Sequence, residues 1–300
     1  MSKTYKICIA FILITLFYNN TSNAIIISEI SYENKYNHLS KPVVAISPEA
    51  NYVLIGNQVQ EKIFFASNTG KILWEKELPP GIEMESGDIS IDGDVIVIGG
   101  QCAASEQNYV FAYLKNGLLF WKESAYGEIP VFISDNSDMI YFADNNKILK
   151  CYNRLGVPEW SQVIDTKGQK IFKITTSENG EKILLLLHKS IIFCDKNGNE
   201  LDRLSPTPFD GCINIDGSIL ALLYSSNSKK YLGLFDIENS YKIIFEKEIL
   251  DYGSVSMDEF NNIYLTVIND KNYLYDIDGN LIQSWINGGY NIAVSKMERN

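Results

Sequence analysis

The sequence predicts an all-β protein, a β-propeller of six to seven four-stranded blades. Two observations carry this prediction. A short pattern of apolar residues, a polar residue and a turn recurs along the chain, and each interval contains four apolar runs separated by turn signals. No segment has apolar residues at helical spacing over three turns. Four short strands in a repeat of about 42 residues describe one propeller blade.

A polar anchor residue ends the first apolar run of each unit, as in VVAISPEANYVLI and DISIDGDVIVI. Successive anchors lie 38 to 44 residues apart. Stacked units of this kind bury the apolar faces that a single unit would leave open. The anchors are Ser47, Ser90, Ser134, Thr176, Asn214, Ser256 and Ser295.

A second pattern recurs in phase with the first: an apolar strand, a turn that ends in glycine, and a strand that carries tryptophan. It is clear in FFASNTGKILW, FAYLKNGLLFW and KCYNRLGVPEW, and looser in FCDKNGNELDR and YDIDGNLIQSW. We expect all the tryptophans to occupy one structural position. The residues of this pattern are Gly70, Gly117, Gly156, Gly198 and Gly279, with Ser240 in the fifth copy, and Trp74, Trp121, Trp160 and Trp285.

The Gly-x-x-x-Trp segments TGKILW and NGLLFW resemble the quinoprotein-type (PQQ-like) β-propeller repeat. The resemblance covers roughly Pro42 to the C-terminus, and it implies that the tryptophans dock between neighbouring blades and are largely buried. A general propeller of the WD-repeat or lactonase type is the competing assignment, because the fourth and fifth units match less well. The chain lacks the vicinal cysteine pair found in several quinoprotein dehydrogenases, and we expect no cofactor.

Residues 1–24 have the pattern of a secretion signal. Two lysines precede the apolar run Ile7–Phe17, and small residues at Ser22 and Ala24 suit a signal peptidase. The run is too short to cross a bilayer core of roughly 30 Å. We therefore expect a cleaved signal peptide, a secreted, periplasmic or extracellular protein, and no membrane span in the mature chain. An uncleaved anchor is the alternative.

The remaining chain divides into residues 25–41, a closing strand and linker, and residues 42–300, the propeller. Six complete units run to Trp285, and the seventh stops after its inner strand. We expect Ile25–Glu33 to form a strand in the sheet that contains Tyr290–Ser295, which would close an incomplete last blade. Irregular closure and a chain that is part of a longer one are the alternatives, so the blade count stays six or seven.

The net charge and the cysteine spacing argue against a nucleic-acid partner and against a zinc site. The net charge of −11 argues against nucleic acid. The absence of a C-x-x-C motif argues against a zinc site. Cys8 lies in the signal-like segment, and the other four cysteines allow three disulfide pairings, between which the sequence does not choose. Cys151 and Cys194 fall on equivalent strands of adjacent blades, which are usually too far apart for a disulfide. We therefore expect buried free thiols at Cys151 and Cys194, and the sequence leaves open whether Cys102 and Cys212 form a disulfide.

No motif in the sequence indicates catalysis. There is no G-x-S-x-G elbow, and the two histidines, His38 and His188, fall in a linker and in a loop at a blade edge. The segments DKNGN and DIDGN look like calcium loops, but neither continues as an EF-hand. Both coincide with a strand-to-strand turn of the repeat, and we interpret them as tight hairpins.

The expected function is binding or scaffolding without catalysis. Loops on a rigid scaffold commonly carry function, and here the face formed by the inter-blade loops is acidic and aromatic. Such a face favours basic partners or cations, and we expect a protein partner. The candidate binding residues are Glu83, Glu85, Glu128, Asp210, Asp251, Tyr252 and Tyr290.

Two other functions stay open on the sequence. The first is a metal-dependent propeller hydrolase or lactonase, with a metal ion held in the central channel by inner-strand side chains. Asn214 is the candidate ligand, since most other anchors are Ser or Thr. The second is one propeller module of a larger surface protein.

Overall fold

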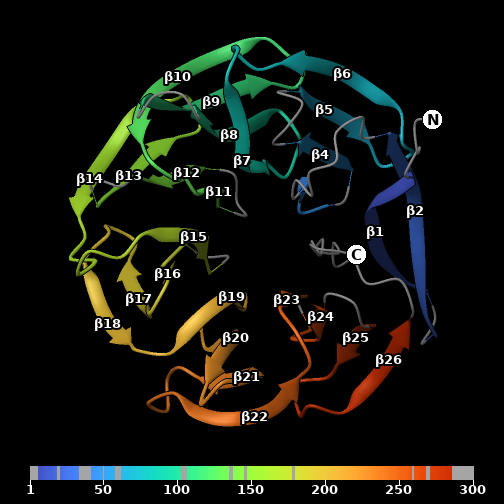
Figure 1. The fold of residues 1–300 in the computed structure, drawn as a ribbon, viewed down its shortest axis with the longest axis vertical. Coiled ribbons are helices and arrows are strands. Elements are labelled where there is room, and N and C mark those ends of the chain that lie inside the picture. The colour runs from blue at the N-terminus through green and yellow to red at the C-terminus, as the bar shows by residue number, and fades with distance from the viewer. Residues whose placement is uncertain are drawn as a thin grey trace, which may run out of the picture.

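The computed structural model describes residues 6–18, 21–33, 42–49, 51–57, 62–102, 107–134, 138–144, 147–177, 180–258, 260–267 and 271–285. Within these ranges every regular element is a strand. Six four-stranded antiparallel sheets stand around a central axis as the blades of a β-propeller (Figure 1). The prediction of an all-β propeller is confirmed.

The first three blades follow the chain in order. Blade 1 contains β3 (Pro42–Ile46), β4 (Tyr52–Asn57), β5 (Lys62–Ser67) and β6 (Ile72–Glu77). Blade 2 contains β7 (Ile82–Ile89), β8 (Val95–Cys102), β9 (Gln107–Leu114) and β10 (Leu119–Tyr126). Blade 3 contains β11 (Val131–Ile133), β12 (Met139–Ala143), β13 (Ile148–Asn153) and β14 (Pro158–Val163).

The other three blades repeat the same order. Blade 4 contains β15 (Ile171–Thr176), β16 (Lys182–Leu187), β17 (Ser190–Asp195) and β18 (Glu200–Leu204). Blade 5 contains β19 (Thr207–Ile213), β20 (Ile219–Ser226), β21 (Lys229–Asp236) and β22 (Lys242–Ile249). Blade 6 contains β23 (Gly253–Met257), β24 (Ile263–Val267), β25 (Asn272–Tyr275) and β26 (Leu281–Trp285).

The first strand of each blade lies nearest the axis and the fourth lies at the periphery (Figure 1). Burial follows this order: five of the six residues of β16 are buried, whereas β18 has only exposed and half-buried residues. Apolar clusters form between the blades, as where Leu54 of blade 1 packs with Ile96 of blade 2. Each blade therefore buries its faces against its neighbours, as expected for stacked repeats.

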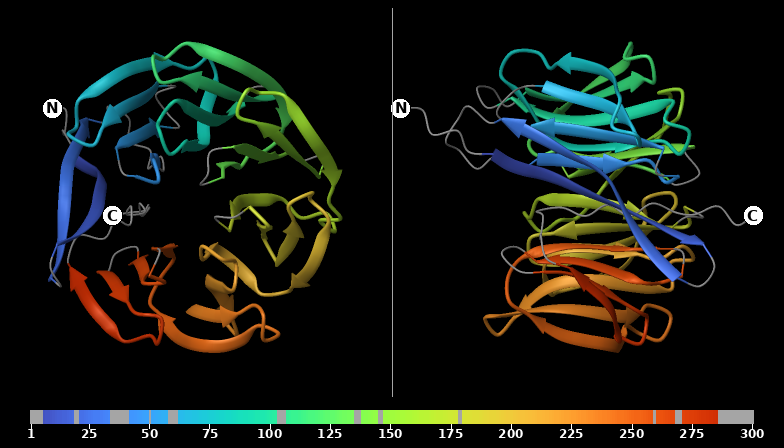
Figure 2. Two further views of the ribbon diagram at one scale, coloured as in Figure 1. Left: turned by 180° about the vertical axis from the view of Figure 1, so that it is seen from behind. Right: turned by 90° about the vertical axis from the view of Figure 1, so that its right-hand side faces the viewer.

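A two-stranded sheet lies between blade 6 and blade 1 (Figures 1 and 2). It pairs β1 (Lys6–Tyr18) with β2 (Thr21–Glu33). The strand expected over Ile25–Glu33 is therefore present as part of β2, but its partner is β1. The expected partner segment Tyr290–Ser295 lies outside the described residues. Removal of residues 1–24 as a signal peptide stays a prediction.

The anchor residues owe their recurrence to the turn between the first and second strands. In every blade a buried polar side chain accepts a hydrogen bond of 2.8 to 3.1 Å from a backbone N–H at the start of the second strand or, in blade 6, from the residue just before it. Two anchors assigned from the sequence are wrong, because Ser177 rather than Thr176 and Asp258 rather than Ser256 form this bond. Ser295 lies outside the described residues. The acceptors are Ser47, Ser90, Ser134, Ser177, Asn214 and Asp258.

In blades 2, 3, 4 and 6 the glycine of the third-to-fourth turn lies against the aromatic residue of the preceding blade. All five repeat glycines have a positive φ, between 76° and 81°. A Cβ added at Gly156 would lie 2.3 Å from Trp121, and one at Gly198 would lie 2.6 Å from Trp160. At Gly279 the facing ring is Phe245, which replaces tryptophan in blade 5. Glycine is thus required for both the backbone conformation and the close approach.

Two expectations about the tryptophans are corrected by the structure. Trp74 is buried, but Trp121 and Trp160 are only half-buried. Trp285 is not equivalent to the other three, because it pairs with Asn272 near the end of its strand. Gln283 holds the tryptophan position of blade 6, opposite Leu274 in the centre of the third strand.

Blade 4 has Asp202 at the tryptophan position, opposite Phe193. The glycine that would face it is replaced in blade 5 by Tyr241, four residues before Phe245, and not by Ser240 as expected; Tyr241 has a φ of 59°. The Tyr241 ring lies 5.4 Å from that of Phe193. Burial and a hydrogen bond to Asp202 raise the pKa of the Tyr241 hydroxyl. At this interface a tyrosine of blade 5 therefore packs onto blade 4, in place of a tryptophan of blade 4 that would pack onto blade 5.

Candidate functional site

Antiparallel strands place the blade turns on two faces of the ring. The first-to-second and third-to-fourth turns share one face, which we call the turn face. Hydrogen bonds from Lys115 N to Asp94 O and from Arg154 N to Asp138 O join such turns within blades 2 and 3. The inter-blade connections and the second-to-third turns form the opposite face, the loop face.

Three of the predicted binding residues come together on the loop face at blades 2 and 3. Glu83 and Glu85 are in β7, and Glu128 is in the connection that follows β10. We call these three residues the acidic cluster. Burial, with the negative charge of Glu128, raises the pKa of Glu85 to about 7. Lys170, which precedes β15, forms an ion pair of 2.9 Å with Glu128.

Asp210 is a structural brace and not an exposed binding residue as expected. Its carboxylate accepts hydrogen bonds from Ser254 Oγ at 2.8 Å and from Val255 N at 2.7 Å, both in the inner strand of blade 6. Its other oxygen lies 2.5 Å from Lys173 Nζ of blade 4. Ser86 does the same between blades 2 and 3, where its Oγ accepts from Val131 N. These side chains join inner strands that belong to separate sheets.

Asp251 and Tyr252 lie at a different part of the loop face, between blades 5 and 6. Lys230 Nζ is 2.7 Å from the Asp251 carboxylate and 3.9 Å from the centre of the Tyr252 ring. The Tyr252 ring also meets Phe209 edge-on at 5.0 Å. These residues are therefore held by intramolecular contacts, although Tyr252 stays exposed. Tyr290 lies outside the described residues.

The residues considered for chemistry on the sequence have other roles. The side chain of Asn214 bonds Ile219 N, Ser218 Oγ and Asn261 Oδ1 at the turn. His188 is exposed in the turn that joins β16 to β17, against Phe172. His38 lies outside the described residues. Within the described ranges, no group of three or more His, Cys, Asp or Glu side chains could hold a metal ion.

The turn segments that look like calcium loops are hairpins, as interpreted. The carboxylate of Asp195 accepts from Asn199 N at 2.8 Å, and that of Asp276 accepts from Asn280 N at 2.7 Å. Each aspartate thus caps its own turn, which ends at a glycine of positive φ.

The four cysteines of the propeller are free, and burial raises the pKa of the Cys151, Cys194 and Cys212 thiols to about 12. These thiols are therefore neutral at physiological pH.

In the part of the chain that the structure describes, no helix has the length and apolar character needed to span a bilayer.

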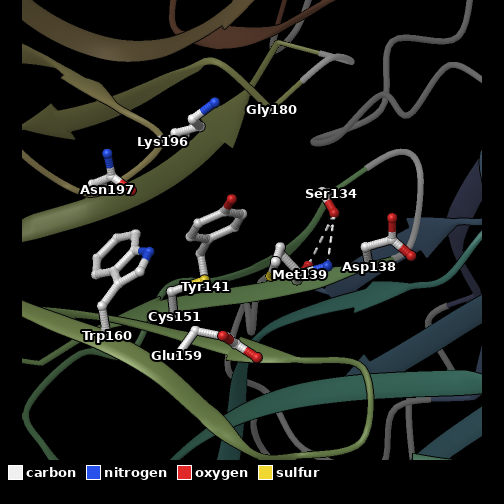
Figure 3. Close-up of a pocket in the computed structure, with 10 residues that line it drawn as sticks. All are labelled: Ser134, Asp138, Met139, Tyr141, Cys151, Glu159, Trp160, Gly180, Lys196 and Asn197. Atoms are coloured by element: carbon white, nitrogen blue, oxygen red, sulfur yellow. Dashed lines mark hydrogen bonds between the residues drawn. The ribbon is translucent and has the colours of Figure 1, made fainter.

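A pocket of about 310 Å³ opens on the turn face between blades 3 and 4 (Figure 3). Sequence reasoning missed it, because its walls come from segments more than 60 residues apart and no motif marks them. The lining residues are Ser134, Asp138, Met139, Tyr141, Cys151, Glu159, Trp160, Gly180, Lys196 and Asn197.

No family model and no curated protein matches the chain. Among solved structures, Kuenenia stuttgartiensis hydrazine synthase is similar, with a TM-score of 0.64 and 16% sequence identity. The match covers 79% of this chain and 76% of that chain. At this identity the likeness shows the fold alone. The strand order and this likeness agree that the chain is a β-propeller.

Proposed function

We propose that this protein is a non-catalytic binding propeller that uses the acidic cluster to hold a basic segment of a partner protein. The observation that carries the proposal is the meeting of three carboxylates, Glu83, Glu85 and Glu128, on the loop face. We further infer that the blades belong to the quinoprotein-type repeat, on the strength of the glycine-to-tryptophan docking across blade interfaces.

The electrostatics of the acidic cluster favour a cationic partner. Burial disfavours the ionised form of Glu85, and the Glu128 carboxylate adds to this effect. A lysine or arginine of a partner would supply the opposite charge and stabilise the ionised form. Binding near neutral pH would therefore release a proton from Glu85, and its strength would fall with rising salt.

We also propose that the protein is exported. The signal-like segment 1–24 supports this, since cleavage after Ala24 would remove β1 and leave β2 from Ile25 onward. A strand that has lost its partner exposes unpaired backbone groups, so β2 would then be available to close the ring with another strand.

Binding of an oligolysine decapeptide, measured by isothermal titration calorimetry at low salt, tests the proposed function. A variant that combines Glu83→Gln, Glu85→Gln and Glu128→Gln should bind at least about tenfold more weakly, a difference of about 1.4 kcal/mol. The matched control neutralises three lysine-paired carboxylates elsewhere, through Glu75→Gln, Glu181→Gln and Glu248→Gln.

Equal weakening in both triple variants would show that only the overall negative charge attracts the peptide, and would overturn the proposal. Titrations at pH 7 in two buffers of different ionisation enthalpy give a second readout. The wild type should release protons on binding, and a Glu85→Gln variant should not.

A further inference from the structure

We propose that the pocket between blades 3 and 4 binds a small organic cation with a methylated ammonium group. This site is on the turn face, opposite the acidic cluster, and the inference does not depend on the proposed function.

An aromatic and apolar wall forms the blade 3 side of the pocket. The rings of Tyr141 and Trp160 lie 6.1 Å apart between centroids and are tilted by 51° (Figure 3). Met139 and the neutral thiol of Cys151 complete this side. Both rings line the same volume, and the negative face of an aromatic ring attracts a diffuse cation.

The charges around the pocket also favour a cation. Asp138 and Glu159 contribute carboxylates from blade 3, and Asn153 Nδ2 donates to Glu159 at 2.8 Å. The Glu159 charge also acts on Cys151, where it adds to the effect of burial in raising the thiol pKa. Lys196 is the one basic side chain in the lining, and Glu181 neutralises it in an ion pair of 2.9 Å.

The pocket lies at an interface where, among the described residues, blade 4 has no aromatic ring in contact with the tryptophan of blade 3. At two other interfaces a tyrosine of the following blade contacts the docked tryptophan: Tyr113 lies 5.8 Å from Trp74, and Tyr152 lies 5.5 Å from Trp121. Each of these tyrosines comes directly after the third-strand residue that pairs with the tryptophan position of its own blade. In blade 4 the residue at this place is Cys194. Blade 4 instead lines the pocket with Gly180, Lys196 and Asn197.

The combination of aromatic, apolar and carboxylate groups in the lining favours a methylated ammonium over a primary ammonium. A primary ammonium is strongly hydrated and needs several hydrogen-bond acceptors when it leaves water. A methylated ammonium spreads its charge over apolar methyl groups, which suit the ring faces, Met139 and Cys151. The carboxylates of Asp138 and Glu159 would then act through their field, without direct hydrogen bonds to the cation.

The test compares choline with 3,3-dimethylbutan-1-ol, its neutral isostere, by calorimetry and ligand-observed NMR on the purified chain. Choline should bind at least about tenfold more tightly, which corresponds to about 1.4 kcal/mol of cation recognition. Equal affinity for the two compounds would show a cavity that does not recognise the cation, and would overturn the proposal. The absence of choline binding up to roughly 10 mM would also overturn it.

Variants locate the site. Glu159→Gln, an isosteric change of an exposed side chain, should weaken choline binding by about threefold to tenfold through the lost charge. Glu248→Gln removes the same charge from blade 5 and should leave affinity unchanged. Trp160→Leu should abolish choline binding, and thermal melting establishes that the variant is folded. Equal effects of Glu159→Gln and Glu248→Gln would refute binding in this pocket, even if Trp160→Leu fails to fold.

Discussion

The docking of tryptophan on glycine can be separated from the backbone requirement for glycine by comparing two substitutions. Gly156 has a φ of 76°, and a Cβ there would lie 2.3 Å from Trp121. Gly168 has a φ of 79°, and a Cβ there would meet nothing within 4 Å. Alanine at either position takes the same left-handed conformation, but only at Gly156 does it also displace a ring.

The magnitudes differ by a measurable amount. Left-handed alanine costs about 1–2 kcal/mol, and the lower entropy of the unfolded chain offsets about 0.4–1 kcal/mol of this. Gly168→Ala should therefore lower the free energy of unfolding by about 1 kcal/mol. Overpacking against Trp121 adds about 1–3 kcal/mol, so Gly156→Ala should cost about 2–4 kcal/mol.

Guanidinium unfolding followed by tryptophan fluorescence gives both values. A double variant with Gly156→Ala and Trp121→Leu should recover part of the loss, because the ring that clashes with the new methyl group is gone. If Gly156→Ala and Gly168→Ala destabilise equally, glycine is needed only for its backbone, and the interlocking of neighbouring blades described above is wrong.

Three further predictions concern the same interfaces and the acidic cluster. Trp74→Ala should cost about 3–5 kcal/mol in chemical unfolding, because Trp74 is buried and its Nε1 donates to Lys115 O at 3.0 Å; half-buried Trp121, whose Nε1 has no partner among the described residues, should cost less when replaced by alanine. Asp202→Trp alone should destabilise because it meets Tyr241, and Tyr241→Gly in the same chain should restore thermal stability; no recovery would contradict the exchange. Folding raises the pKa of Glu85 from 4.5 to about 7, so the wild type should lose stability as the pH rises through this window. Solvent screening limits the loss to about 1–2 kcal/mol, and a pH series of melting curves should show no such loss for Glu85→Gln.

The repeat can be predicted from the sequence alone. Strand-forming runs, capped turns and glycines of positive φ act within one blade, over distances of a few residues, so their signals are local and recur with the period of the chain. The six complete units, the hairpin interpretation of the DKNGN and DIDGN segments and the glycine positions follow from such signals. Glu83 and Glu85 could be placed together with Glu128 on one face for the same reason, since strand alternation sets which loops share a face.

Features that depend on contacts with the neighbouring blade are visible only in the folded chain. Trp285 matches the repeat in residue type, yet the strand register gives its place to Gln283. Asp210 looks like a surface carboxylate and is a brace between inner strands. The Asp202–Tyr241 exchange and the pocket beside Trp160 each join residues from different repeats. Contacts between blades depend on side-chain sizes about 40 residues apart, and these are complementary in space without leaving a pattern along the chain.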